Sequence, residues 1–255
     1  MIPKVIHYCW FGNGEMPALA KRCIASWKRI LADYEIKLWN EQNFDVHVSQ
    51  FSREAYDHQM YAFVSDYVRL WALRNYGGIY LDIDVEAVKQ FDDLLNYRVV
   101  LGADDGGCIL SAFMAAEPGH PFIEDALALY NQRRFAREDG GLEITPNTIV
   151  LQSILKNYGW VSTNTEQHLK QDIVLFPDDY FQPKSLITGA CKITGNTYAI
   201  HHHTLLWVSK RVLLVKFLRQ NILVPLLGKS NYMKLTRRIR RMFTNRTSSD
   251  CDRFV

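Results

Sequence analysis

The chain has 255 residues, of which 48% are hydrophobic and 22% are charged, and its formal net charge is +3. This composition excludes a disordered or low-complexity chain and favours a folded protein with one large core. Residues 1–209 hold 18 Lys+Arg against 25 Asp+Glu, whereas residues 210–246 hold 11 Lys+Arg and no acid. The basic total is therefore a property of the C-terminal segment.

The compartment is indicated by the N-terminus and the cysteines. The first residues lack the charged start and the long apolar run of a secretory signal. The five cysteines are odd in number and show no paired spacing, which favours reduced thiols over a disulfide framework or a zinc site. We therefore expect a cytoplasmic protein.

The first elements predict an α/β fold. Residues 4–11 have a strand pattern, residues 17–32 have the apolar stripe of a helix that starts at a proline, and residues 34–39 form a second strand pattern. A strand, a helix and a strand in this order form a crossover unit, which implies parallel pairing. Residues 41–61 are weakly patterned and are expected to form a loop with a short helix.

The most informative stretch spans residues 62–88, where a helix pattern gives way at Gly77 and Gly78 to a strand pattern. In a strand, residues two apart face the same side, so Asp82 and Asp84 would present two carboxylates side by side. Two negative charges so close repel each other, and a divalent cation such as magnesium or manganese would relieve this repulsion. The alternative interpretation of the Asp-x-Asp pair is a solvated edge strand. Asp66 lies three residues before Arg69 on the preceding helix, so the two share a face and can pair or reach the same cleft.

Further elements follow as far as a cluster of histidines. The pattern predicts a helical turn at 91–97, strands at 99–102, 109–115 and 173–176, and helices at 122–134 and 148–158. A short strand from residue 198 ends in His201, His202 and His203. From the residues alone, this cluster is either a metal site or a polar surface group.

The basic C-terminal segment has an amphipathic pattern in which apolar residues alternate with Lys and Arg. It contains no uninterrupted apolar run of about 18 residues, which argues against a transmembrane span. A pair of basic amphipathic helices suits an interfacial position on anionic lipid, and the alternative is a helix packed on the body with a solvated basic edge. Nucleic acid is a less favoured partner, because the body is acidic and lacks a nucleic-acid motif.

The run Ser65-Asp66-x-x-Arg69, followed by Tyr76-Gly77-Gly78-Ile79-Tyr80-x-Asp82-x-Asp84, resembles the donor-site signature of the DXD-motif glycosyltransferases. It is most similar to glycosyltransferase family 32, which is related to the clostridial glucosylating toxins. The resemblance extends to Ile2-Pro3-Lys4-x-Ile6-His7-x-x-Trp10, to Leu38-Trp39-Asn40 and to the Tyr-x-Ile-His-His element at 198–202. The chain departs from the family pattern at 110–112, where an asparagine is usual, and at Leu206, where a serine is usual.

This resemblance implies a fold and a reaction. Residues 1–209 would form a single Rossmann-like domain of the GT-A type with a mixed, mainly parallel sheet, and residues 210–255 would form the helical tail. The enzyme would move a sugar from a nucleotide-sugar, with UDP-sugar favoured, and would retain the anomeric configuration. A divalent Mn²⁺ or Mg²⁺ ion would neutralise the charge that grows on the diphosphate leaving group.

The same resemblance implies roles for individual residues. The metal would be held by Asp84 and His201, with Asp82 and His202 as further candidates, and Asp66 and Arg69 would hold the donor sugar. Nucleotide or sugar contacts would also come from His7, Trp10, Trp39, Tyr80, Ser111 and Trp207. Trp10 and Trp39 follow strand ends, where an aromatic side chain can stack on a base, but core packing is an equal alternative for each. A lone histidine in an apolar strand such as His7 is more often a core residue.

A tail that faces lipid, joined to a cytoplasmic transferase, suggests a lipid-linked oligosaccharide acceptor and a peripheral position on the inner face of the cell membrane. Capsule, O-antigen or exopolysaccharide assembly would use such an enzyme. Two other classes stay open, namely a metal-dependent phosphohydrolase and a non-catalytic membrane adaptor. The phosphohydrolase is less favoured because no downstream lysine and acid cluster follows the Asp-x-Asp pair.

Overall fold

A computed structural model of the chain describes residues 1–204 and 210–243. Its strands are β1 (Val5–Cys9), β2 (Glu35–Trp39), β3 (Gly78–Leu81), β4 (Val85–Ala87), β5 (Val99–Ala103), β6 (Ile109–Ala116), β7 (Gln167–Leu169), β8 (Ile173–Phe176) and β9 (Ala199–His201). Its helices are α1 (Ala18–Ile30), α2 (Gln50–Asp57), α3 (Tyr61–Tyr76), α4 (Pro121–Asn131), α5 (Asn147–Leu155), α6 (Asp178–Phe181), α7 (Lys210–Leu218), α8 (Val224–Leu227) and α9 (Lys229–Phe243).

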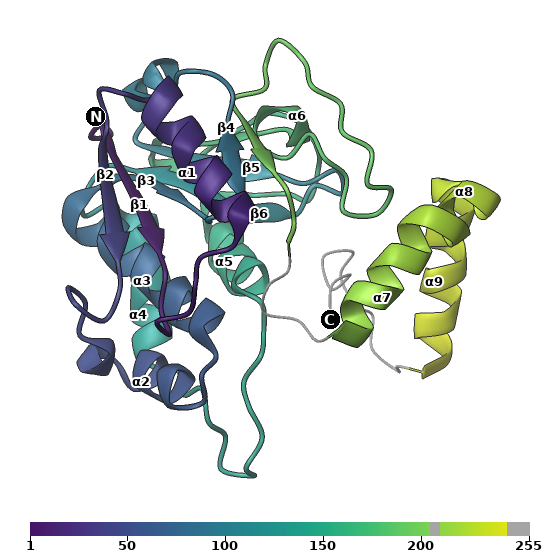
Figure 1. Ribbon diagram of the computed structural model, residues 1–255, viewed down its shortest axis with the longest axis horizontal. Helices are drawn as coiled ribbons and strands as arrows, with labels where there is room; N and C mark the ends of the chain where they lie inside the picture. Colours follow the sequence, from purple (N-terminus) through teal and green to yellow (C-terminus); the bar gives the residue numbers. More distant parts are fainter. Residues whose placement is uncertain (205–209, 244–255) are drawn as a thin grey trace.

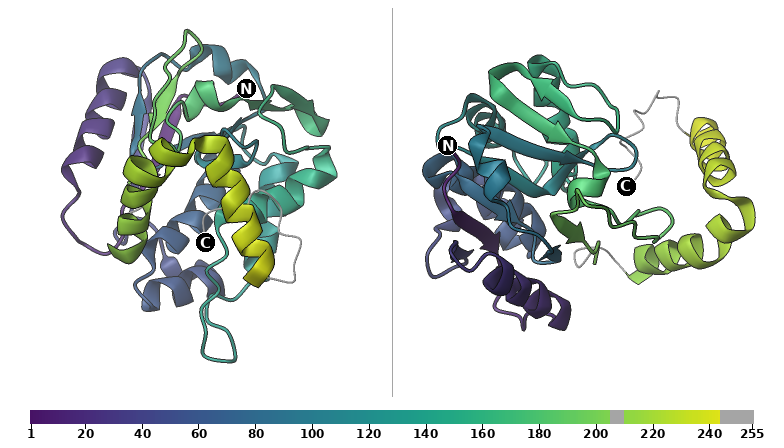
Figure 2. Two further views of the ribbon diagram at one scale, coloured as in Figure 1. Left: turned by 90° about the vertical axis from the view of Figure 1, so that its right-hand side faces the viewer. Right: turned by 90° about the horizontal axis from the view of Figure 1, so that it is seen from above.

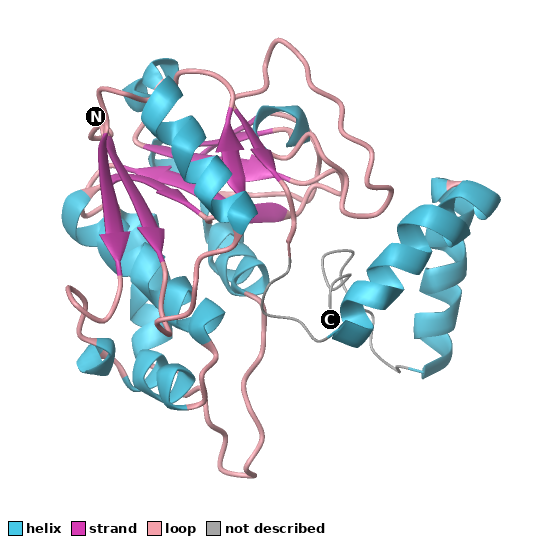
Figure 3. Cartoon of the chain, viewed as in Figure 1, coloured by secondary structure: helices cyan, strands magenta, loops and turns pink. Residues whose placement is uncertain are grey.

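A seven-stranded sheet in the order β2-β1-β3-β6-β5-β8-β7 forms the centre of the body (Figures 1 and 3). One core cluster lies between the sheet and α2, α3, α4 and α5. A second cluster lies on the other face, where α1, β4 and β9 cover the sheet. The two clusters make a three-layer α/β architecture and confirm the predicted fold class.

The first crossover unit forms as predicted. β1 and β2 pair in parallel from Val5 opposite Glu35 to Cys9 opposite Trp39, and α1 connects them. Pro17 precedes the first turn of α1, where its missing N–H costs no hydrogen bond. The apolar stripe of α1 is buried, and the indole of Trp27 donates to the carbonyl of Val85 at 2.7 Å.

The sheet is mixed and five of its seven strands, β1, β2, β3, β5 and β8, run in the same direction, which agrees with the expected mixed, mainly parallel sheet. The pairs β1–β2, β1–β3 and β5–β8 are parallel, whereas β3–β6, β5–β6 and β7–β8 are antiparallel. The reason lies at residues 104–108, where the Asp104 carboxylate accepts the N–H groups of Gly106 and Cys108 and closes a tight turn. Strands joined by so short a connection pair in antiparallel fashion, so β6 runs against both of its neighbours.

The single strand predicted through Asp82 and Asp84 is wrong. β3 ends at Leu81, the N–H of Val85 donates to the carbonyl of Asp82 at 3.0 Å, and the chain turns into β4. β4 pairs with β9 in a separate two-stranded sheet, with Val85 opposite His201. The two aspartates therefore lie on a turn between two sheets.

Glycines join α3 to β3. Gly77 ends α3 with a φ of 63°, and Gly78 follows with a φ of 99°. A Cβ atom on Gly78 would lie 2.5 Å from the carbonyl oxygen of Val5 in the adjacent strand. Only glycine fits this close approach of β3 to β1.

The C-terminal helices stand beside the body (Figures 1 and 2). Arg219 and Gln220 each donate to the carbonyl of Leu186 at 2.9 Å, and Lys229 pairs with Asp105 at 2.8 Å. Among residues 1–204 and 210–243, no helix has the length and apolar character that a membrane span requires. The division of the chain at residues 209 and 210 stays a prediction.

The state of the cysteines differs in part from expectation. Cys9, Cys23 and Cys191 are free thiols. Cys108 is disulfide-bonded, so the expectation of reduced thiols is wrong for this residue.

Candidate metal and donor site

Asp82, Asp84 and His201 come together at the junction of the two sheets. Asp82 and Asp84 lie on the turn after β3, and the β4–β9 ladder places His201 beside this turn. One donor atom of each residue lies within 4.8 Å of the donor atoms of the other two. The Nε2 atom of His201 is 3.4 Å from Oδ1 of Asp84.

Asp84 is held by the chain that follows β9. The backbone N–H and the hydroxyl of Thr204 both donate to Oδ2 of Asp84 at 2.8 Å. Burial alone would raise the pKa of Asp84, but the charge and hydrogen bond of His201 and the two Thr204 donors outweigh it and lower the pKa well below its usual range. The carboxylate is therefore ionised and fixed in place.

These three residues fit a divalent cation. Carboxylate oxygens are the ligands that magnesium and manganese prefer, and an imidazole nitrogen adds affinity for a transition metal such as manganese. The Asp84 carboxylate also needs no deprotonation near neutral pH, since its pKa is lowered. The group of Asp82, Asp84 and His201 is consistent with a divalent metal site in a chain that carries a DXD motif.

Arg69 joins α3 to the same site. Its Nη2 lies 2.9 Å from Oδ1 of Asp66 and 3.3 Å from Oδ1 of Asp82, and its Nη1 donates to the carbonyl of Ser111 at 2.7 Å. The Tyr80 hydroxyl also donates to Oδ1 of Asp82 at 3.0 Å, beneath the Arg69 guanidinium. The spacing argument that Asp66 and Arg69 can pair and reach the two acids agrees with this geometry.

Asp66 lies at the buried end of this network. Burial raises the pKa of Asp66 to about 7, against the lowering effect of the Arg69 charge. A carboxyl group with such a pKa can accept or donate a hydrogen bond near neutral pH.

The sequence did not predict a further polar group, which is formed by Tyr130, Arg133 and Asn147. The Tyr130 hydroxyl donates to Oδ1 of Asn147 at 3.0 Å, and the Arg133 guanidinium lies 5.0 Å from the Tyr130 ring. Within the part of the chain that the structure describes, Nη1 of Arg133 and Nδ2 of Asn147 are buried without a hydrogen-bond partner. The positive charge of Arg133 lowers the pKa of Asp66, so Arg133 lies within electrostatic reach of that carboxyl group.

His7 and Trp39 are packed in the core, and their expected contact with a nucleotide stays a prediction. They are 0% and 2% exposed, respectively. The Nε2 atom of His7 lies 2.8 Å from the carbonyl oxygen of Gly77, and the Trp39 indole donates to Nδ1 of His7 at 3.2 Å. The ring nitrogens of His7 and the indole N–H of Trp39 are thus satisfied inside the protein.

Two other tryptophans were expected to contact the nucleotide. Trp10 is partly exposed, its indole donates to the carbonyl of Gly14 at 2.8 Å, and its contact with a nucleotide stays a prediction. Trp207 lies outside the described residues.

The three histidines take different roles. His201 is the one that joins Asp82 and Asp84. The Nε2 atom of His202 instead lies 2.9 Å from Oε2 of Glu86, so the structure does not support His202 as a ligand of this group. His203 is buried, with its ring 4.0 Å from that of His201 and its Nε2 3.1 Å from the carbonyl oxygen of Lys184.

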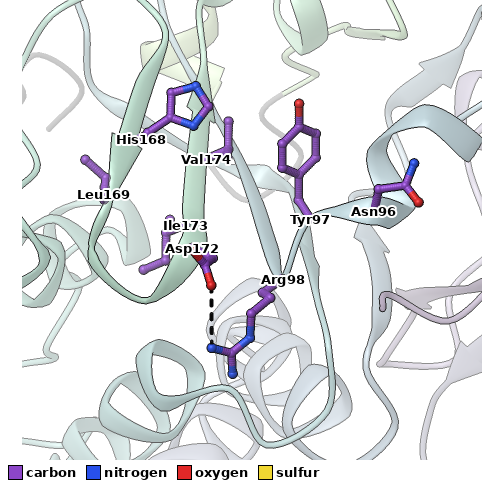
Figure 4. A pocket seen from close by; sticks show the side chains of 8 residues that line it. All are labelled: Asn96, Tyr97, Arg98, His168, Leu169, Asp172, Ile173 and Val174. Carbon is purple, nitrogen blue, oxygen red and sulfur yellow. Dashed lines mark ion pairs between the residues drawn. The ribbon is translucent and has the colours of Figure 1, made fainter.

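A cavity of about 350 Å³ lies at the opposite edge of the sheet (Figure 4). It is lined at the amino ends of β5 and β8, where Arg98 and Asp172 lie 3.9 Å apart. Asp82 and Asp84 follow the carboxyl end of β3, so this cavity is not part of the candidate site.

Comparison with known proteins agrees with the position of the site. Residues 17–101, which include Asp82 and Asp84, match the family described as "Glycosyltransferase sugar-binding region containing DXD motif". Inositol phosphoceramide mannosyltransferase 3 of Schizosaccharomyces pombe is 33% identical over 143 residues, which cover 53% of this chain and 38% of that protein. The uncharacterized glycosyltransferase L373 of Acanthamoeba polyphaga mimivirus is 24% identical over 215 residues, which cover 79% of this chain and 82% of that protein.

The likeness extends over only part of some relatives. The chain spans between 37% and 46% of the length of the three similar mannosyltransferases of S. pombe. Among solved structures, the PaToxG glycosyltransferase has a TM-score of 0.48 and 18% identity, and the match covers 62% of this chain and 70% of that one.

Proposed function

We propose that this chain transfers a hexose from a nucleotide-sugar with the aid of a divalent cation. The match of residues 17–101 to the DXD-motif sugar-binding region of glycosyltransferases supports this proposal. The observation that carries the proposal is the convergence of Asp82, Asp84 and His201, with Arg69 linking Asp82 to α3. Such a group combines a cation site with a fixed positive charge, and a diphosphate sugar needs both.

Asp84 and His201 would hold the cation directly, and Asp82 would contact it or the ribose. A bound Mn²⁺ or Mg²⁺ would act as a Lewis acid toward the diphosphate that leaves when the glycosidic bond breaks. Thr204 keeps the Asp84 carboxylate in place, and Tyr80 does the same for Asp82. These contacts preorganise both carboxylates before the donor binds.

Arg69 and Asp66 would orient the donor sugar. Arg69 is fixed by Ser111 and Asp66, so its guanidinium presents donors in one direction. Asp66 is able to accept or donate a hydrogen bond to a sugar hydroxyl because its pKa is about 7. Ser111 lies beside them on β6, and we propose that its hydroxyl bonds the sugar.

We further propose a GT-A type of donor binding with retention of the anomeric configuration, as the motif resemblance implies. A UDP-sugar is the favoured donor. The relatives named inositol phosphoceramide mannosyltransferases support a lipid-linked acceptor. Their names also make a mannosyl donor the main alternative to a UDP-sugar.

Calorimetry of the purified protein with UDP and with GDP, each with and without Mn²⁺, tests the donor site. We expect tight binding of one nucleotide only when Mn²⁺ is present. Asp84→Asn should abolish this binding, whereas Asp139→Asn, which changes an exposed aspartate outside the candidate metal group, should leave it intact. If neither nucleotide binds under either condition, the proposal fails.

Transfer is then measured with the sugar panel that the bound nucleotide selects. Product formation on a lipid-linked acceptor, followed by NMR of the anomeric proton, tests the acceptor class and the stereochemistry together. An inverted product would overturn retention without affecting the donor site. Release of inorganic phosphate from simple phosphoesters, without sugar transfer, would instead favour a phosphohydrolase.

A further inference from the structure

The C-terminal helices expose an unusual amount of apolar surface. Across the described residues, ten of the 17 large hydrophobic side chains that are exposed belong to residues 213–235. We call this set the tail apolar surface, and its main members are Leu214, Val215, Phe217, Ile222, Leu223 and Leu226. The other seven are scattered over residues 1–193. Isolated exposed hydrophobic residues are ordinary, but nine of the ten in the tail apolar surface lie within residues 213–227, and such a concentration marks an interaction surface.

The charge of the same segment indicates what this surface meets. Residues 210–246 contain 11 Lys+Arg and no acid. In α9, Lys234 and Arg238 are exposed to solvent. Basic side chains among exposed apolar ones match an anionic bilayer, where lipid phosphates attract the cations and the acyl boundary accepts the apolar side chains. The tail of a second copy would instead bring like charges together.

The tail is also tied to a neighbour of the candidate metal group. The Lys216 ammonium donates to the carbonyl of His203, whose ring packs 4.0 Å from that of His201. Arg219 and Gln220 fasten the next turn to the carbonyl of Leu186. The helices lie on the side of the body where the chain leaves β9 (Figure 2). A surface bound by the tail would therefore lie close to the strand end that carries His201.

We propose that residues 210–243 form a docking surface for an anionic lipid bilayer and that docking brings the candidate metal group to the membrane face. Leu214, Phe217 and their neighbours enter the interface, and the basic residues lie at the level of the phosphates. This inference rests on exposure and charge, and it does not depend on the proposed sugar transfer.

Co-sedimentation of the full chain with vesicles tests the inference. The vesicles contain phosphatidylcholine alone or phosphatidylcholine mixed with phosphatidylglycerol. We expect binding to the anionic vesicles only, and weaker binding as salt is added. Leu214→Glu and Phe217→Glu, which change side chains that are 57% and 58% exposed, should each weaken binding about tenfold or more.

The matched control is Val161→Glu, since Val161 is also 57% exposed but lies on the body. It should bind vesicles like the unmodified chain. The double variant Lys234→Glu with Arg238→Glu tests the charge separately and should reduce binding to anionic vesicles. Circular dichroism establishes that each variant is folded.

Three results would overturn the inference. One is absence of binding to anionic vesicles, and another is equal binding to both kinds of vesicle. The third is a chain that self-associates in sedimentation velocity, ignores vesicles and becomes monomeric on Leu214→Glu, which would make the tail apolar surface an interface between copies. Nucleotide binding measured in solution, without vesicles, separates a failure of docking from a failure of the donor site.

Discussion

Replacing Thr204 by valine tests whether the chain after β9 positions the metal residues. Valine keeps the size and branching of threonine but lacks the hydroxyl that donates to Oδ2 of Asp84 at 2.8 Å. The backbone N–H of residue 204 would still donate to the same oxygen at 2.8 Å. The substitution therefore removes one of two neighbouring donors and leaves the ligands themselves unchanged.

The expected magnitude follows from this geometry. A hydrogen bond to a charged group contributes about 1.5–3 kcal/mol, and the remaining N–H bond places the loss at the low end of that range. A loss of about 1.5 kcal/mol corresponds to roughly tenfold weaker binding of Mn²⁺, which is at the lower end of the effect of residues that orient metal ligands. The pKa of Asp84 should also rise, because its ionised form loses a donor.

Calorimetric titration with Mn²⁺ in the presence of the bound nucleotide measures the effect. Thr204→Ser is the matched control, since it restores the hydroxyl and should bind Mn²⁺ like the unmodified chain. If Thr204→Val binds Mn²⁺ as tightly as the unmodified chain while Asp84→Asn does not bind it, the hydroxyl has no positioning role and this reasoning is refuted.

Three other predictions follow from contacts at α3, β1 and α2. Arg69→Lys keeps the positive charge but loses the forked contacts to Asp66 and Ser111. We therefore expect about 100-fold slower sugar transfer with an unchanged affinity for the nucleotide alone. An equal loss of transfer rate and of nucleotide affinity would instead place Arg69 at the nucleotide. Burial lowers the pKa of His7 to about 4. Between pH 6.5 and pH 4 the unfolded chain therefore binds a proton that the folded chain does not. The free energy of unfolding should fall by about 3 kcal/mol as the pH drops through this window. Urea unfolding of His7→Gln should show a shallower fall, and an unchanged slope would assign the effect to other groups. Glu54→Gln should lower the free energy of unfolding by about 1–3 kcal/mol, because the Glu54 carboxylate accepts the N–H groups of residues 135 and 136 at 2.9 Å each; a urea midpoint equal to that of the unmodified chain would contradict this.

Local patterns in the sequence predict the elements whose contacts are local. The helix from residue 18 and its two flanking strands follow from apolar periodicity and a proline, because the crossover unit needs no distant partner to be recognised. The shared face of Asp66 and Arg69 follows from helix geometry in the same way. The motif from Ser65 to Asp84 could also be recognised from the sequence, because its residues lie within one short stretch of the chain.

The errors arise where a distant contact decides the structure. The alternation of apolar and polar residues continues through Ile83, although the chain already turns after Leu81 to meet β9. A pattern of period two fits both a strand and this turn, so only the partner strand distinguishes them. The core packing of His7 and Trp39 also depends on a distant contact, because each satisfies polar atoms of the other from strands 32 positions apart.

No pattern in the sequence predicted that Thr204 contacts Asp84. The resemblance placed the expected hydroxyl at Leu206, where the chain has none, and the contact between Thr204 and Asp84 spans 120 positions. No local period carries such information. The buried donors of Arg133 and Asn147 were missed for a similar reason, since their polar neighbours come from separate helices.

The ladder between β4 and β9 has a consequence for how the protein is made. Because β9 and Thr204 come late in the chain, a nascent polypeptide that has already formed the seven-stranded sheet still lacks part of the metal group. Contacts of such long separation form slowly, since loop closure costs entropy before the contact contributes. A cation that binds only the completed group would favour that last step, adding about 2.7 kcal/mol at a concentration 100 times its Kd. Divalent metal in the growth medium should therefore raise the yield of folded protein as well as its activity.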